Sequence, residues 1–306
     1  MKRSTRLKWI IVGTIGVWTA SCCPAFAQGV AFTWDDLPAH SSLPPNQTRV
    51  AIAQAILTAM HDAHMPPAYG FVNGIQIRNE PASAPALDLW RSAGLPLGNH
   101  TWSHMNLNEH SVEEFENDIE KNEPLLQAKA GHSDWRWLRF PYLAEGDTPQ
   151  KKIAVRTYLA QHGYRVAGVT MSFGDYAWNE PYARCIAKAD QPAIASLEKS
   201  YLNAAAAALD YSSAMSKALF GHVIPLVLLM HVGAFDAHML PRLLQLYREH
   251  GVTFLTLEEA ERDPFYAFDT DLSLTSGTDS LEAAMAQRHL PLPTHDGLPD
   301  LSKVCR

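Results

Sequence analysis

Residues 30–36 read Val-Ala-Phe-Thr-Trp-Asp-Asp, and this stretch decides the fold class. Its first five residues are small, β-branched or aromatic, which is typical of a buried strand. Asp35 and Asp36 follow at once. Two adjacent carboxylates at the end of an apolar strand are costly to bury unless a cation lies near them. The stretch therefore predicts a strand whose carboxyl end carries a polar site, with a solvated turn or a helix cap as the alternative.

The same order, an apolar strand followed by a helical segment, recurs along the chain. Helices are indicated by apolar residues at helical spacing and by start signals such as Thr48 and the capping box Ser111-Val-Glu-Glu114. The predicted strands are 30–34, 69–72, 97–100, 137–140, 164–170, 224–231 and 252–256. The predicted helices are 48–61, 83–93, a helix from 111 through 119 that could continue beyond Pro124, 148–163, 191–219 and 237–250. Roughly seven strand–helix units favour a parallel barrel or a doubly wound sheet.

The first 27 residues have the pattern of a secretory signal peptide. A basic start is followed by an apolar stretch and by Ala25-Phe-Ala27, a small-x-small cleavage pattern. A lipoprotein anchor on Cys22 or Cys23 is the alternative. Cleavage would leave residues 28–306 and, with four basic residues removed, would take the net charge from −7 to −11. We therefore expect a secreted or periplasmic protein.

The acidic balance restricts the partners. A protein of this charge has no electrostatic reason to bind nucleic acid or anionic lipid, and a neutral or partly cationic partner suits it better. Beyond the signal, no segment is long and apolar enough to span a bilayer, so no stable membrane insertion is expected.

The last part of the chain, 263–306, has weak periodicity and is predicted to be an extended segment that wraps around the domain of residues 28–262. It carries Cys305. Once the signal is removed, Cys185 and Cys305 are the only cysteines left, and an oxidising compartment favours a disulfide between them. Two unrelated free thiols are the alternative.

Polar side chains gather just after the predicted strands. In parallel α/β barrels the carboxyl ends of the strands form one rim, and that rim carries the site. The residues concerned are Asp35, Asp36, His100, His104, Arg139, Pro141, Tyr142, Asp175 and His231. Each cluster alone has an ordinary explanation, such as a cap, a turn or a buried core histidine. Their common position favours one functional site.

A metal centre is the chemistry that this set favours. His100 and His104 lie four residues apart and could face one ion if the segment turns helically, although such pairs are common in a chain with fourteen histidines. Asp36 would complete a His-His-Asp set. Three protein ligands with one open position are typical of catalytic zinc.

The clusters, in this order, resemble the motifs of the polysaccharide deacetylase family, also called the NodB-homology carbohydrate esterases. The resemblance spans about residues 30–231. Thr33-Trp-Asp-Asp36 is similar to Thr-Phe-Asp-Asp-Gly, His100-Thr-Trp-Ser-His104 to His-Ser/Thr-x-x-His, Arg139-Phe-Pro-Tyr142 to the third motif, Asp175-Tyr176 to Asp-Trp, and Leu229-Met-His231 to Leu-x-His. The resemblance implies a distorted (β/α) barrel with about seven parallel strands.

The resemblance also implies a role for each residue. The metal ligands would be Asp36, His100 and His104, with zinc as the expected ion and cobalt or nickel as alternatives. Asp35 would be the general base, oriented by Arg139, and His231 the general acid, tuned by Asp175. The Tyr142 amide would hold the oxyanion and Leu229 would line the pocket for the acetyl methyl group.

Two departures affect the expected substrate. Leu37 replaces the glycine after the acidic pair, and Tyr176 replaces a tryptophan, for which Trp178 could compensate. The expected partner is an acetylated polysaccharide or oligosaccharide; peptidoglycan, chitin-like oligomers, acetylated xylan and exopolysaccharide all fit. Two rival functions remain: a metal-free hydrolase of cyclic amides or ureides with the same fold, and a carbohydrate-binding protein with an inactive site.

Overall fold

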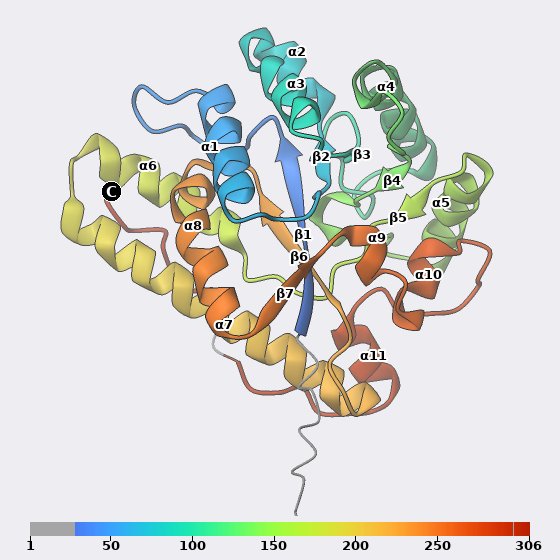
Figure 1. The fold of residues 1–306 in the computed structure, drawn as a ribbon. Coiled ribbons are helices and arrows are strands. Elements are labelled where there is room, and N and C mark those ends of the chain that lie inside the picture. Colours follow the sequence, from blue (N-terminus) through green and yellow to red (C-terminus); the bar gives the residue numbers. More distant parts are fainter. Residues whose placement is uncertain (1–27, 296) are drawn as a thin grey trace, which may run out of the picture.

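A computed structural model describes residues 28–295 and 297–306 of the chain, and its centre is a parallel sheet (Figure 1). The expected signal peptide lies outside the described residues. The strands of this seven-stranded sheet are β1 (Gln28–Leu37), β2 (Gly70–Val72), β3 (Leu97–Asn99), β4 (Trp137–Leu138), β5 (Arg165–Val166), β6 (Leu226–His231) and β7 (Val252–Leu255). All of their pairings are parallel, as the alternation of strands and helices predicts.

The long strand β1 organises the sheet. The strand order is β5-β4-β3-β2-β1-β6, and β7 pairs with the first residues of β1. On the side of β1 away from β2, β6 pairs with β1 along six residues, from Val30 opposite Leu226 to Asp35 opposite His231. The sheet curls, and Met171, which follows β5, forms a parallel bridge with Leu228 of β6. The result is the expected distorted barrel, in which Asp35 and His231 end neighbouring strands.

Helices surround the sheet (Figure 1). They are α1 (Arg49–Asp62), α2 (Gly74–Asn79), α3 (Pro85–Ser92), α4 (Val112–Ala130), α5 (Pro149–Gln161), α6 (Asn179–Ala187), α7 (Gln191–Phe220), α8 (Ala234–Glu249), α9 (Leu257–Ala260), α10 (Ala267–Thr270) and α11 (Leu281–Gln287). Thr48 caps α1, and Ser111 with Glu114 forms the capping box of α4. These side chains satisfy backbone N–H groups that the first helical turn leaves without partners.

The two faces of β1 have different neighbours because adjacent side chains of a strand point to opposite sides. Phe32 and Trp34 pack outward against Tyr247 of α8 and Trp90 of α3, with ring centroids 6.0 and 6.4 Å apart. All four rings are buried. The alternate residues of β1 face the inside of the curled sheet, which places a carboxylate at its rim.

The fifth strand is shorter than predicted. The apolar run 164–170 predicts one strand, but only Arg165 and Val166 pair with β4. The chain then leaves this ladder, and the Thr170 and Met171 amides donate to the Val227 carbonyl of β6. Most of the run is apolar because it is buried, and a buried apolar segment forms a strand only where its backbone pairs with a neighbouring strand.

The C-terminal part is more structured than an extended segment. It contains α10, α11 and a short 3₁₀ turn at Pro264–Tyr266. Its last residues are joined to α6 by a disulfide between Cys185 and Cys305, with an S–S distance of 2.09 Å. Among the described residues, no helix combines the length and apolar character needed to cross a membrane.

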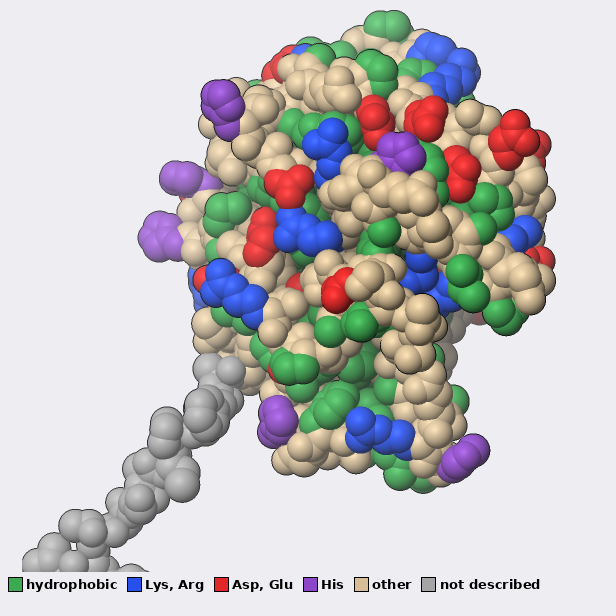
Figure 2. Space-filling model, turned by 90° about the vertical axis from the view of Figure 1, so that its right-hand side faces the viewer, with side chains coloured by type: hydrophobic (Ala, Val, Ile, Leu, Met, Phe, Trp, Pro, Cys, Tyr) green, Lys and Arg blue, Asp and Glu red, His purple; other side chains and the backbone are tan. Residues whose placement is uncertain are grey.

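Charges on the surface are mixed. Figure 2 shows acidic and basic side chains interspersed on one face of the molecule. Ion pairs between opposite charges on the surface include Lys152 with Asp279 and Arg165 with Asp134. The face in view offers no broad patch of a single sign for a highly charged polymer.

Candidate metal centre and active site

Asp36, His100 and His104 converge at the carboxyl ends of β1 and β3. The Oδ1 atom of Asp36 lies 3.6 Å from Nε2 of each histidine. Ligand atoms about 2.0–2.1 Å from a tetrahedral zinc ion are about 3.4 Å apart, so the observed spacing fits one ion. Within the described chain, these are the residues of the one cluster of histidine, cysteine and acidic side chains that could hold a metal.

The first histidine is oriented by its second nitrogen. Nδ1 of His100 lies 2.7 Å from the carbonyl oxygen of Arg139 and donates its hydrogen to it. This bond fixes the orientation of the ring and points Nε2 at the cluster, as in metal-binding histidines. His100 is 1% exposed, so no competing solvent contact disturbs the arrangement.

The second histidine reaches the cluster through a turn, whereas the spacing suggested a helical turn. Thr101 and His104 both have a φ of 58°, which is left-handed backbone. Asp118 of α4 anchors the turn, because its Oδ2 accepts hydrogen bonds from the Ser103 amide and hydroxyl at 2.8 and 2.9 Å. The segment between the histidines is thus held from outside the site.

The charges of the cluster suit a cation. Burial raises the pKa of Asp36, but the neighbouring histidines, His100 foremost, outweigh burial and lower it overall. Burial and the charge of His100 lower the pKa of His104 to about 4. At neutral pH the cluster therefore presents a carboxylate and a neutral imidazole at His104, which are the ligand states that divalent metals bind.

Asp35 has a different partner from its neighbour. Nη1 of Arg139 donates to Asp35 Oδ1 at 3.2 Å, and Nη2 donates to the Thr33 hydroxyl at 3.0 Å. The Arg139 Nε also donates to the Ala167 carbonyl at 2.9 Å, and its side chain is fully buried. The planar guanidinium thus fixes the Asp35 carboxylate beside the metal cluster.

His231 and Asp175 form a second fixed pair. Nδ1 of His231 is 2.9 Å from Asp175 Oδ1, and the His231 amide donates to Asp175 Oδ2 at 2.6 Å. Burial lowers the pKa of His231, but the charge and hydrogen bond of the buried Asp175, together with the charges of Asp36 and Asp35, outweigh burial and raise it to about 10. The imidazole is therefore protonated at neutral pH and able to donate a proton.

The residues expected to contact substrate divide into two groups. Tyr142, with a φ of 59°, is 67% exposed, and its ring lies 4.5 Å from that of His104; Tyr176 is 50% exposed and lies 5.2 Å from His231. Leu229 lies on the same face of β6 as His231. Trp178 was expected to compensate at the cleft, and this is wrong. It is fully buried and donates its Nε1 hydrogen to Ser200.

Sequence patterns missed His40. Its ring lies edge-on to His231 with centroids 5.3 Å apart, and its amide donates to the Val232 carbonyl. Asn179 accepts from the Phe235 amide through Oδ1, so its Nδ2 donates to His40 Nε2 at 3.2 Å. His40 is therefore a neutral acceptor, in agreement with burial lowering its pKa to about 4. No periodicity marks the loop that carries it.

A cavity of about 330 Å³ opens beside the candidate metal ligands Asp36 and His104. It is lined by Asp36, Ala39, His40, Ser41, Arg49, Gln76, Asn79, Glu80 and His104. Arg49 Nε donates to Glu80 Oε2 at 2.8 Å, so the two opposite charges compensate each other. The lining offers polar groups without a net cationic character, which suits a hydroxyl-rich ligand better than a polyanion.

Part of the chain matches a known family model in sequence. Residues 26–167 match the family model described as polysaccharide deacetylase, and this range includes Asp36, His100, His104 and Arg139. Asp175 and His231 lie beyond it. No curated protein matches the chain significantly in sequence.

Solved structures share the fold at low sequence identity. A BA3943 mutant, a CE4 family pseudoenzyme with restored enzymatic activity, has a TM-score of 0.53 and 16% identity, covering 77% of this chain and 68% of that one. The wild-type pseudoenzyme from Bacillus anthracis has a TM-score of 0.53 and 15% identity over 77% of this chain and 66% of its own. T48 deacetylase, solved with substrate, has a TM-score of 0.52 and 17% identity over 83% and 97%. Residues 26–167 thus match the polysaccharide deacetylase family in sequence, which confirms the resemblance, and the chain shares its fold with the solved pseudoenzyme and deacetylase structures.

Proposed function

We propose that the protein is a secreted, metal-dependent hydrolase that removes N- or O-acetyl groups from a polysaccharide or oligosaccharide. The observation that carries the proposal is the convergence of three groups at one rim. These are the His-His-Asp cluster, a carboxylate fixed by Arg139, and a protonated imidazole fixed by Asp175. Each has the chemistry that one step of amide or ester hydrolysis requires.

The donor set fits a divalent metal, with zinc as the expected ion and cobalt or nickel as alternatives. Asp36, His100 and His104 would hold it through one oxygen and two Nε2 atoms. An ion bound there would supply Lewis-acid activation of water and of the acetyl carbonyl. The remaining chemistry falls to side chains and amides of this chain.

Asp35 is the proposed general base. It takes the proton from water as the oxygen attacks the acetyl carbonyl, and Arg139 holds the carboxylate in place while it does so. The amide of Tyr142 donates to the oxygen on which negative charge develops. Removal of one such donor in comparable sites costs about 3 kcal/mol of transition-state stabilisation.

His231 is the proposed general acid. The carbon–nitrogen or carbon–oxygen bond breaks as His231 protonates the departing sugar amine or hydroxyl, and acetate is the second product. Asp175 keeps the imidazole protonated and correctly oriented. Leu229 and Tyr176 are proposed to contact the acetyl group and the sugar beside this acid.

Acetate release tests the proposal. Purified protein is incubated with peptidoglycan, chitin-like oligomers, acetylated xylan and an acetylated exopolysaccharide, and acetate is measured before and after chelation and with zinc added back. We expect release from at least one polymer, loss after chelation and recovery with zinc. Carbohydrate binding without acetate release would favour an inactive relative, and metal-free hydrolysis of a cyclic amide would favour the other rival.

A further inference from the structure

The loop that carries Asp175 is held by packing and turns, with no strand ladder of its own. On its inner side, the ring of Phe173 contacts Tyr201 of α7 at a centroid distance of 5.0 Å. On its other side lies the end of the chain. Gly174 has a φ of 65°, and a Cβ added there would lie 2.6 Å from Cδ1 of Leu298. Leu298 therefore packs directly on the residue that precedes Asp175.

The segment 297–306, which we call the strap, is also attached to the helix that follows this loop. Cys305 is bonded to Cys185 of α6. Arg184 donates through Nε and Nη2 to the Val304 carbonyl at 3.1 and 2.9 Å. The strap thus contacts the chain just before Asp175 and again ten residues or so after it, on α6.

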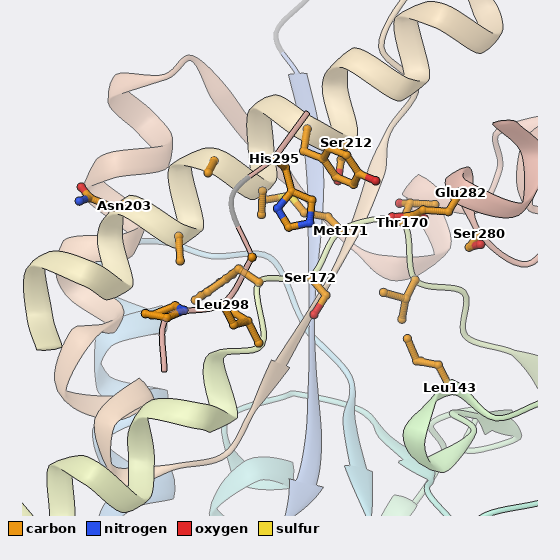
Figure 3. Close-up of a pocket in the computed structure, with 18 of the residues that line it drawn as sticks. Leu143, Thr170, Met171, Ser172, Asn203, Ser212, Ser280, Glu282, His295 and Leu298 are labelled. Carbon is orange, nitrogen blue, oxygen red and sulfur yellow. The ribbon is translucent and has the colours of Figure 1, made fainter. Parts of the chain in front are cut away.

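Between the strap and the barrel there is a cavity of about 410 Å³. Figure 3 shows Leu298 of the strap together with Met171 and Ser172, which lead into the Asp175 loop, among the residues that line it. Because this space lies between the first residues of the strap, Gly297 to Pro299, and the segment before the loop, Val169 to Ser172, the contact of Leu298 with Gly174 carries more of the support on that side. Without this contact, the packing of the loop would rest mainly on Phe173 and its contact with Tyr201.

We propose that the strap holds the Asp175 loop in its active position, with Leu298 as a positioning residue and the Cys185–Cys305 bond as its anchor. Asp175 accepts hydrogen bonds from both Nδ1 and the amide of His231, so movement of the loop separates the acid from its partner. The consequence for turnover rests on the proposed function, whereas the consequence for loop order does not.

Two variants and a control test this proposal. Leu298→Ala removes the contact with Gly174, and Cys305→Ser releases the anchor. Leu274→Ala is the matched control, because Leu274 is also an exposed leucine of the C-terminal part but lines a groove against α5. Hydrogen exchange is measured for residues 172–178 and for the His231 amide. Turnover is measured with an N-acetyl oligosaccharide and with an aryl acetate whose leaving group needs little protonation.

In both variants we expect exchange in residues 172–178 and at the His231 amide to rise by about tenfold. We also expect kcat on the N-acetyl substrate to fall by about tenfold, with kcat on the aryl acetate, KM and metal content nearly unchanged, since only the acid is disturbed. Leu274→Ala should leave all of these unchanged. Unaltered exchange in residues 172–178, or equal losses on both substrates, overturns the proposal. If the wild-type protein releases no acetate, the proposed function fails and the exchange data alone decide the role of the strap.

Discussion

Asp35 and Asp36 are adjacent in the chain, yet both reach the same histidine. In an extended strand, neighbouring side chains point to opposite faces. The φ of 66° at Asp36 breaks this alternation, so that His100 Nε2 lies 3.5 Å from Asp35 Oδ2 and 3.6 Å from Asp36 Oδ1. Aspartate tolerates left-handed backbone better than most residues, and Leu37, which stands where the resembled motif has glycine, is not itself left-handed. One backbone angle thus places the proposed base beside the proposed ligand.

This division of roles predicts the behaviour of Asp35→Asn. The amide keeps the shape of the side chain but cannot take the proton from water, so turnover should fall by about 10²–10⁴-fold. Metal content should remain at one ion per chain, because Asp36 and the two histidines are unchanged. Elemental analysis and acetate release on the same sample measure both quantities. Near-normal turnover would mean that another residue accepts the proton, and metal loss would mean that Asp35 is itself a ligand.

The acid predicts a pH dependence. Burial lowers the pKa of His231, but the charge and hydrogen bond of Asp175, together with the charges of Asp36 and Asp35, raise it overall to about 10. The imidazole therefore loses its proton only as the pH rises through that region. Asp175→Asn removes the strongest charge that opposes burial and leaves only Asp36 and Asp35 to raise the pKa of His231, so the alkaline limb of kcat should move to lower pH. A bound cation lowers the limb in both proteins alike. The pH profile of deacetylation of an N-acetyl oligosaccharide checks this, and an unmoved limb would exclude His231 as the titrating acid.

At this scale, sequence reasoning located the residues with short-range signals. The proposed ligands, base and acid each lie at or just after the end of an apolar strand, and their sequence motifs occur along the chain in the order of the resembled family. His40 has no such signal, since it lies in a loop and depends on a backbone bond to Val232 and a side-chain bond to Asn179. Trp178 was misplaced for the opposite reason, because its proximity in sequence to Asp175 says nothing of the side to which a 3₁₀ turn directs it.

The strands and helices differ in how far their sequence patterns determine them. Long elements with caps, such as α1 and α4, occur where predicted, because their periodicity and their capping residues agree. The short helices α2 and α6 were missed, since fewer than three turns give little periodicity. A helical turn was one way for His100 and His104 to face one ion, but the segment between them is not helical, and its two left-handed residues are anchored by α4.

That anchorage can be tested through Asp118. Asp118→Ala removes the acceptor for the Ser103 amide and hydroxyl, so the turn that presents His104 should loosen while His100 keeps its bond to the Arg139 carbonyl. Support residues of metal sites typically contribute 10–100-fold to affinity, and we expect zinc affinity to fall by about tenfold. Calorimetric titration of metal-free protein measures it. Asn117→Ala, on an exposed position of the same helix, is the control, and equal affinities in the two variants would show that the turn holds itself.

At the scale of the molecule, the alternation of strands and helices predicts a parallel α/β fold but does not separate a barrel from an open sheet. The two differ in whether the edge strands meet, which depends on pairings between distant segments. Here the bridge from Met171 to Leu228 and the pairing of β7 with the start of β1 decide the matter. Neither pairing has a local sequence signature, because each joins segments that are far apart in the chain. The same holds for the two-residue strand β5, which is a strand only through its pairing with β4.

The disulfide also affects the whole molecule, because the segment between its two cysteines contains both β6 and β7. Cys185 and Cys305 are 120 residues apart, and the chain-entropy account assigns about 4–5 kcal/mol of stability to closing such a loop. Cys185 is fully buried, so a small uncharged replacement is the safer test. The double variant Cys185→Ala/Cys305→Ser should therefore lower the free energy of unfolding in urea by several kcal/mol, on the order of the loop-closure value. Thiol titration of unfolded, unreduced wild-type protein without its signal should find no free thiol. Two free thiols per chain, or a double variant as stable as the wild type, would show that the tail is held by its noncovalent contacts alone.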